Sequence, residues 1–167
     1  MKISIYPDDV LRKKSIKVEP FDAETRSQLL EMHSAILNHD GVGLAAPQVG
    51  ILKRMFVVDL HDGAGPLFFV NPEVRDLKAG TSSATEGCLS VPGAWGAVAR
   101  PSCVIVRYEA FDGRRSEKTF SGLMARVVQH ETDHLDGIIL LDRMESYVKR
   151  AVLEGVWEAR VKSRNQP

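Results

Sequence analysis

Two histidines four residues apart stand out in QHETDHLDG, residues 129–137. On a helix, this spacing places His130 and His134 on one face, one turn apart, so that both imidazoles can reach one metal ion. Glu131 projects near that ion but too far round the helix to be the obvious third ligand, and it is better placed to accept a proton from water. The pattern therefore predicts a metal site that activates water, against the alternative of a solvated helix face with two chance histidines.

The segment around these histidines has the signals of a buried helix. Ser121 can cap a helix over residues 122–135, which Gly137 ends. Apolar residues precede the first histidine, at positions Leu123, Val127 and Val128. Because buried His and Glu side chains need partners, a buried helix favours the metal interpretation.

The third ligand decides the class of metal site. No histidine follows His134 in the sequence. A ligand of the zincin kind would therefore be a downstream glutamate: Glu145, Glu154 or Glu158. Upstream, Cys88 lies in TEGCLSVPG, residues 85–93, where glycine and proline predict a rigid loop that can present a thiolate. One Cys and two His leave a fourth position open, which a catalytic metal needs, so Cys88 is a good third ligand beside the glutamate alternatives.

The other cysteine and the upstream histidines have simpler interpretations. Cys103 begins a segment of alternating polarity, and we expect it to be a small buried residue of a strand. The upstream histidines lack ligand-like surroundings and are expected to be surface or capping residues: His33, His39 and His61.

Further helices and strands must position this centre. Asp22 is a suitable N-cap for a helix over 23–39 with Gly41 as its left-handed C-cap, and a last helix is expected over about 145–162. Strand patterns occur at 55–60, 67–70, 103–110 and 116–120, the last two joined in a hairpin by Asp112-Gly113. Residues 76–87 are polar and loop-like, and the small residues of 41–50 do not suit a packed helix. The order is not an alternating βαβ pattern, so we expect an α+β fold, with small, mostly antiparallel sheets around the helix that carries the histidines.

Composition bounds the remaining possibilities. A chain of 167 residues, with 44% hydrophobic and 26% charged residues, fits one domain over residues 1–167. Lys+Arg and Asp+Glu both number 22, and this zero net charge argues against a nucleic-acid role. Two cysteines favour a reducing compartment. Without a signal-like first segment or an apolar run of membrane length, we expect a cytoplasmic protein with no membrane partner.

Three segments together resemble the signature motifs of peptide deformylases, in the family's order. They are GVGLAAPQ (41–48), EGCLS (86–90) and QHETDH (129–134), and ISIYPDDVLR (3–12) is similar to the family's opening stretch. The resemblance spans roughly residues 3–145. It implies an enzyme that removes the formyl group from the N-terminal formyl-methionine of nascent proteins and releases formate. It also implies one divalent metal ion, natively Fe²⁺, with Zn²⁺, Ni²⁺ or Co²⁺ able to occupy the site.

The resemblance implies a role for each motif residue. Cys88, His130 and His134 are the expected metal ligands, and Glu131 is the expected general acid/base. Gln48 and the backbone N–H of Leu89 are expected to hold the oxygen of the formyl group, as donors to an oxyanion do. The alternative for Gln48 is a loop glutamine that bonds to the backbone.

The expected substrate-binding residues lie near these motifs. Gly41 and Gly43 would let an exposed edge pair with a peptide main chain. The methionine slot would be lined by Val42, Leu44, Val127 and the stem of Arg126. Glu86 would meet the amine end of the substrate or brace the Cys88 loop.

Two positions near the second motif are less constrained. Trp95 stands where many relatives carry a basic residue, and it would pack over the substrate or cover the core. Arg100 would pair with Asp133 and thereby orient a ligand, or remain solvated.

The C-terminal helix has a basic side beside an apolar stripe, which consists of Val148, Val152, Val156 and Trp157. In some family members this helix docks on the ribosome, and the alternative is a helix packed on the domain with a solvated basic face. Two other functions compete with deformylation: an HExxH peptidase that uses a downstream glutamate, and a non-catalytic metal-stabilised module that binds nascent chains or ribosomes.

Overall fold

The computed structural model of the protein describes the backbone of residues 1–164 and the side chains through residue 155. Two short 3-10 helices are η1 (Asp9–Arg12) and η2 (Ala46–Val49). The α-helices are α1 (Ala23–Leu37), α2 (Gly122–Leu135), α3 (Leu140–Arg143) and α4 (Ser146–Arg164). The strands are β1 (Gly43–Ala45), β2 (Met55–Val58), β3 (Leu67–Asp76), β4 (Thr81–Gly87), β5 (Trp95–Pro101), β6 (Cys103–Glu109) and β7 (Arg115–Ser121).

Five strands form the larger sheet, in the order β1-β2-β3-β6-β7, with antiparallel neighbours throughout. Its inner strands are covered on both faces, which explains the unbroken apolar run of β2. Met55 and Val57 join a core cluster with residues of α1, whereas Phe56 and Val58 join another with residues of α2. The sheet therefore fixes α2 from one side.

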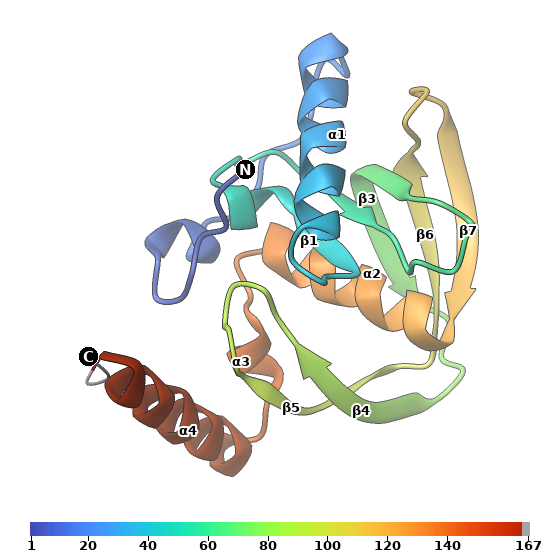
Figure 1. Ribbon diagram of the computed structural model, residues 1–167. Helices are drawn as coiled ribbons and strands as arrows, with labels where there is room; N and C mark the ends of the chain where they lie inside the picture. The colour runs from blue at the N-terminus through green and yellow to red at the C-terminus, as the bar shows by residue number, and fades with distance from the viewer. Residues whose placement is uncertain (165–167) are drawn as a thin grey trace.

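A second sheet of two strands, β4 and β5, lies on the other side of α2 (Figure 1). A third core cluster joins this sheet to η1, α3 and the start of α4, and includes Val98, Leu140 and Val148. In Figure 1, α2 crosses the centre of the molecule between the two sheets. Residues from both sheets thus reach the helix that carries the histidines.

The observed fold confirms the predicted α+β class with mostly antiparallel sheets. Helix α2 has the predicted bounds, and Gly137 takes the left-handed φ of 74° that ends it. Asp22 caps α1, because its Oδ1 accepts a hydrogen bond from the N–H of Thr25 at 2.9 Å. Ser121 holds the N-cap position of α2, but its side chain makes no capping hydrogen bond.

Gly41 is not the left-handed cap of α1. The helix ends at Leu37, and the positive φ of 51° falls on Asp40. The need for glycine at position 41 is one of space, because a Cβ there would lie 2.8 Å from Cδ1 of Leu89.

One strand occupies a segment that the sequence pattern predicts to be a loop. Residues 81–87 form β4, and β5 follows the Cys88 loop. The side chains of β4 are exposed over its first five residues, so this strand has no apolar alternation for a sequence pattern to detect. Its pairing with β5, from Thr81↔Pro101 to Gly87↔Trp95, holds it in place.

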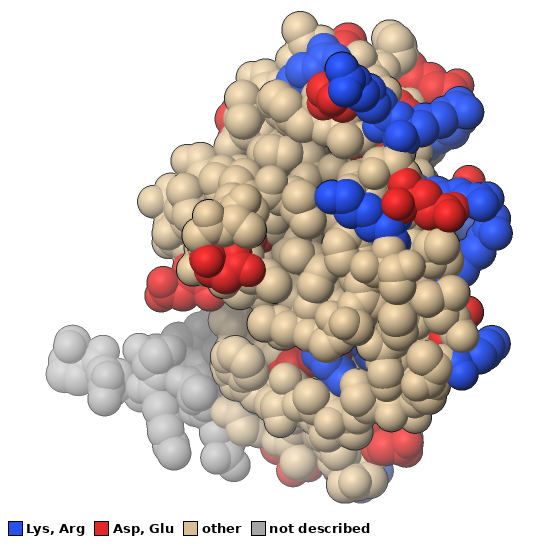
Figure 2. All heavy atoms as spheres, turned by 90° about the vertical axis from the view of Figure 1, so that its right-hand side faces the viewer, with Lys and Arg blue, Asp and Glu red and all other residues tan. Residues whose placement is uncertain are grey.

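The surface carries mixed charge. On the face shown in Figure 2, Lys and Arg side chains lie beside Asp and Glu side chains, and neither sign covers the face. This agrees with the zero net charge of the sequence. Among the described residues, no helix has the length and apolar character needed to cross a membrane.

Candidate metal and active site

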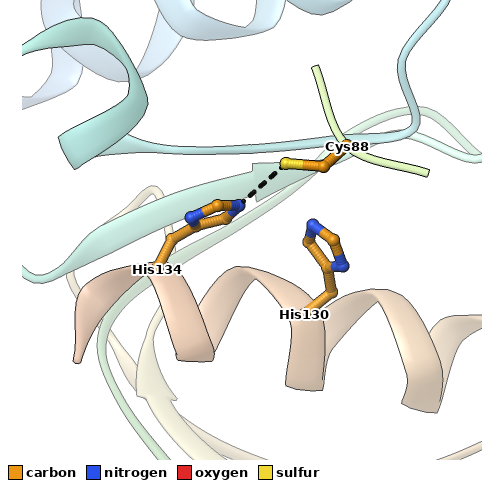
Figure 3. A group of neighbouring side chains, drawn as sticks. All are labelled: Cys88, His130 and His134. Atoms are coloured by element: carbon orange, nitrogen blue, oxygen red, sulfur yellow. Dashed lines mark hydrogen bonds between the residues drawn. The ribbon is translucent and has the colours of Figure 1, made fainter. Parts of the chain in front are cut away.

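Three potential metal ligands converge between α2 and the loop that follows β4. Ligand atoms of Cys88, His130 and His134 all lie within 4.8 Å of one another. Sγ of Cys88 lies 3.3 Å from Nε2 of His134, and Figure 3 shows both imidazoles on α2 turned toward the sulfur. No glutamate joins this group among the described residues, and the side chain of Glu158 lies outside them.

Buried charges hold the first histidine in place. Glu86, at the end of β4, accepts a hydrogen bond from Nδ1 of His130 at 3.1 Å. The same carboxylate accepts two from Arg100, at 2.7 and 2.9 Å, and one from Arg126 at 2.6 Å. Burial opposes ionisation of Glu86, but the bonds from His130 and Arg100 outweigh it and hold its pKa at about 2. Glu86 therefore stays ionised and orients His130 with the second ring nitrogen toward the sulfur.

The pairing of Arg100 with Asp133 is confirmed, with Nη1 of Arg100 2.9 Å from Oδ2 of Asp133. Arg143 of α3 also donates to Asp133, through Nε at 2.9 Å. Asp133 lies on α2 beside the histidines, so these bonds tie the helix to β5 and to α3. No role for Arg143 follows from the sequence, because nothing in its local pattern indicates this contact.

The surroundings of Cys88 favour its ionised form, the thiolate. Burial alone would disfavour the charged form, but the neighbouring imidazoles of His134 and His130 lower the pKa of Cys88 well below its ordinary value. A thiolate is the form of cysteine that binds metal ions.

Glu131 is buried directly beside the ligands, with 4% of its surface exposed. Burial raises the pKa of Glu131 to about 7, against the lowering effect of the charges on His130 and His134. Among the described residues, Oε2 of Glu131 has no hydrogen-bond partner. The glycine of β1 makes room for this side chain, since a Cβ at Gly43 would lie 2.4 Å from Oε1 of Glu131.

The amide of Gln48 is fixed in one orientation. Its Oε1 accepts a hydrogen bond from the N–H of Ala45 at 2.7 Å, so Nε2 must point the other way. There Nε2 lies 3.2 Å from Oγ of Ser90 and 3.7 Å from Sγ of Cys88. Ser90, fully buried, is a residue that sequence reasoning missed; its hydroxyl within the second motif was the available signal. The N–H of Leu89 has no acceptor among the described residues.

A cavity of about 800 Å³ leads to this centre. Of the sequence-predicted substrate residues, six line it: Gly41, Val42, Gly43, Glu86, Arg126 and Val127. Leu44 does not, because its side chain is fully buried in the core cluster with α1. The cavity is also lined by Trp95 and Leu123, both more than half exposed, and by Ile5, which the sequence analysis did not assign.

Comparison with known protein families shows to which family the chain that carries this centre belongs. The family model described as polypeptide deformylase matches residues 1–150. The chain belongs to the polypeptide deformylase family.

Relatives and solved structures of deformylases agree over nearly the whole chain. A peptide deformylase of Caldicellulosiruptor bescii is 44% identical over 153 residues, which are 92% of this chain and 90% of that one. The peptide deformylase structure from Legionella pneumophila superposes with a TM-score of 0.90 at 34% identity and covers 99% of this chain and 98% of its own. The structure from Synechococcus elongatus, in complex with actinonin, has a TM-score of 0.88 at 37% identity and covers 93% and 85%. The resemblance predicted from the three motifs is therefore confirmed.

The donor set of this deformylase site fits a divalent metal ion. Ligand bonds of about 2.0–2.3 Å require donors only a few ångströms apart, as these are. The set offers a soft thiolate and two imidazoles, which suit zinc as well as iron. Three protein donors would leave a fourth position for water or substrate, and Glu131 and Gln48 line the cavity together with Cys88 and His130.

Proposed function

We propose that this chain hydrolyses the formyl amide of N-terminal formyl-methionine on nascent polypeptides and releases formate. The observation that carries the proposal is a thiolate and two imidazoles within 4.8 Å, with the buried carboxylate of Glu131 beside them. A purely structural metal site has no use for a partnerless acid next to its ligands, whereas hydrolysis needs a group that moves protons. Family membership supports the same reaction.

Cys88, His130 and His134 would hold the ion, with Fe²⁺ as the proposed native metal and Zn²⁺, Ni²⁺ or Co²⁺ as substitutes. When bound, the ion supplies a Lewis acid that lowers the pKa of water and polarises an oxygen of the substrate. Glu131 takes the proton of the attacking water on its carboxylate and delivers it to the departing amine. Because the pKa of Glu131 is raised to about 7, the side chain can both accept a proton from water and donate it to the amine near neutral pH.

Two donors would stabilise the oxygen of the formyl group. Nε2 of Gln48 faces the ligands because Ala45 fixes the amide oxygen. The N–H of Leu89 follows Cys88 directly in the chain and has no acceptor among the described residues. Donors held in place before the reaction stabilise developing negative charge without reorganising, which is the main source of their catalytic effect.

The rest of the substrate would lie along the cavity. Gly41, Val42 and Gly43 form an edge that can pair with its main chain, whereas Leu44, buried in the core, would contribute no side chain to the methionine slot. Val127 and the stem of Arg126 would contact the methionine side chain. The charged end of Arg126 pairs with Glu86, so Glu86 braces the site and does not offer a free charge to the substrate amine.

We further propose one catalytic domain over residues 1–167, working in the cytoplasm, where formylated chains leave the ribosome.

Ribosome association through α4 is a second proposal. Its first turns pack on the domain through Val148 and Val152, and Arg150 is exposed. Replacing Arg150, Arg160 and Lys162 by glutamine should reduce co-sedimentation with ribosomes; unchanged co-sedimentation would remove the idea. Val156 and Trp157, the other expected members of the apolar stripe, lie outside the described side chains.

The test of the proposed activity is formate release from a short formyl-Met peptide by anaerobically purified, Fe(II)-loaded protein. Glu131→Gln keeps the size of the side chain but removes the proton acceptor, so its kcat should fall about 10²–10⁴-fold while metal content stays the same. Equal rates in both proteins would favour a non-catalytic binding module. Cleavage of internal peptide bonds without formate release would favour the HExxH peptidase.

A further inference from the structure

The outer end of β1 is tied to a group of polar side chains behind it. Val42 O accepts a hydrogen bond from the N–H of Asp59 at 2.9 Å. One residue earlier, Gly41 O lies 2.9 Å from Nε2 of His61. Since a carbonyl can only accept, His61 donates from Nε2. Both bonds hold the segment with which Gly41 and Val42 line the cavity.

Asp59 and His33 set the position of His61. Oδ2 of Asp59 bonds Nε2 of His33 at 2.8 Å, and its Oδ1 accepts from the N–H of His61 at 2.9 Å. His33 belongs to α1, so the group is anchored to a helix. His61 has a positive φ of 56°, which few residues other than glycine adopt, and this turn aims its ring at Gly41.

The same segment is the open edge of the larger sheet. Because alternate residues of an antiparallel strand face opposite sides, the bond at Val42 O leaves the peptide groups of Gly43 facing away from β2. The inner end of β1, Ala45, is fully buried and bonds to Gln48, whereas Val42 at the outer end is 36% exposed. A peptide whose formyl group lies at the metal ligands must therefore leave the site along Gly43, Val42 and Gly41.

We propose that His61 is a positioning residue for the polypeptide part of the substrate, because its bond to Gly41 O holds the outer end of this edge in register. The inference rests on the proposed function and extends it to the residues that follow the methionine. His61 lies outside the three motifs and is not among the residues that line the cavity. Its effect is therefore expected on peptide affinity and not on the chemical step.

The deciding variants keep the turn intact. His61→Gly removes the donor and tolerates the positive φ, while His61→Gln returns an amide N–H at similar reach. For a formyl-Met tetrapeptide, His61→Gly should raise KM about 3- to 10-fold, the value of one hydrogen bond, with kcat within about 2-fold. His61→Gln should recover most of this loss. Lys78→Gly, an exposed position with a φ of 57°, is the matched control and should behave as wild type.

Substrate length separates positioning from a general defect. With formyl-Met amide, which lacks the following residues, KM of His61→Gly should match that of wild type. An equal rise in KM for both substrates, or no rise for either, would overturn the inference.

Amide hydrogen exchange tests the same bond without any activity. Exchange over residues 41–45 should speed up in His61→Gly and return toward wild type in His61→Gln, because loss of the hydrogen bond that holds Gly41 favours local opening. If wild type releases no formate, the proposed function fails while this measurement still decides the role of His61. Unchanged exchange in His61→Gly would rule out positioning.

Discussion

At the scale of single residues, the site contains buried polar atoms that the fold itself does not satisfy. Among the described residues, Oε2 of Glu131 and Nδ1 of His134 have no partner. A buried polar atom without a hydrogen bond costs free energy of about 1–3 kcal/mol. Such atoms persist where a bound group or a reaction uses them. Glu131 lines the cavity beside Cys88 and His130, whereas Nδ1 of His134 is the ring nitrogen that does not face Cys88.

Gln48 should contribute to the rate and little to substrate binding. Its Nε2 is held toward the ligands before any substrate arrives, so Gln48→Ala should lower kcat about 10²–10³-fold. Steady-state kinetics with metal content measured in the same samples checks this. A fall in metal content that accounts for the whole loss would contradict a direct role.

Gly43 provides the space in which Glu131 lies. Gly43→Ala would place a Cβ 2.4 Å from Oε1 of Glu131 and 2.9 Å from Cγ1 of Val127, so the carboxylate must move. We expect kcat/KM to fall at least about 10²-fold, since displacements near 1 Å cost that much. Gly155→Ala, at an exposed position of helix α4 with open space around it, is the control and should leave activity unchanged. If Gly43→Ala keeps the wild-type kcat/KM, the side chains of Glu131 and Val127 accommodate the added Cβ without loss of function, which would contradict this prediction.

At the scale of secondary-structure elements, α2 is fixed to the small sheet by buried ion pairs. Arg100 of β5 connects Glu86 of β4 to Asp133 of α2, and its side chain is 5% exposed. Glu86 also holds His130. The β4–β5 sheet therefore orients His130, an expected metal ligand, although none of the three expected ligands lies within its strands.

Arg100→Met should be strongly destabilising. It leaves Glu86 and Asp133 with fewer partners in a buried place, and breaking such a pair costs about 3–5 kcal/mol of unfolding free energy. Denaturant unfolding measures this. Arg107→Met breaks a pair with Glu117 whose side chains are 54% and 42% exposed, and it should cost about 0–1 kcal/mol. Similar costs for both variants would contradict the importance of the buried network.

Elements with strong local patterns were predictable from the sequence, and elements held by distant partners were not. Helix α2 has an apolar face, a terminal glycine and the His-Glu-x-x-His spacing, all within its own residues. Strand β4 is exposed at its first five residues and depends on pairing with β5, so polarity alone predicted a loop. At the site, His130 and His134 follow from spacing. The only local signal for Ser90 is its hydroxyl within the second motif, because its partner Gln48 is distant in the chain, and no local pattern records the contact of Arg143 with Asp133.

At the scale of the whole molecule, the metal site lies where two separately packed parts meet. The histidines come from α2, packed on the larger sheet, while Cys88 follows β4 of the small sheet. In the unfolded chain these ligands are 42 and 46 residues apart, from 130 − 88 and 134 − 88. An ion that binds all three therefore binds the folded state and stabilises it.

Removal of the metal should lower thermal stability. An ion present at 100 times its Kd contributes about 2.7 kcal/mol, and each kcal/mol shifts Tm by about 2–4 °C in a chain of this size. Chelation should therefore lower Tm by about 5–10 °C in wild type. Cys88→Ser should lose most of this difference. The same Tm shift in Cys88→Ser would argue that the ion binds elsewhere.

The most direct test titrates metal-free protein with Fe²⁺ under anaerobic conditions and measures bound iron and formate release from a formyl-Met peptide in the same samples. Activity should rise in proportion to bound iron and level off at one ion per chain. Full occupancy without formate release, or formate release that does not depend on bound iron, would contradict a catalytic metal held by Cys88, His130 and His134.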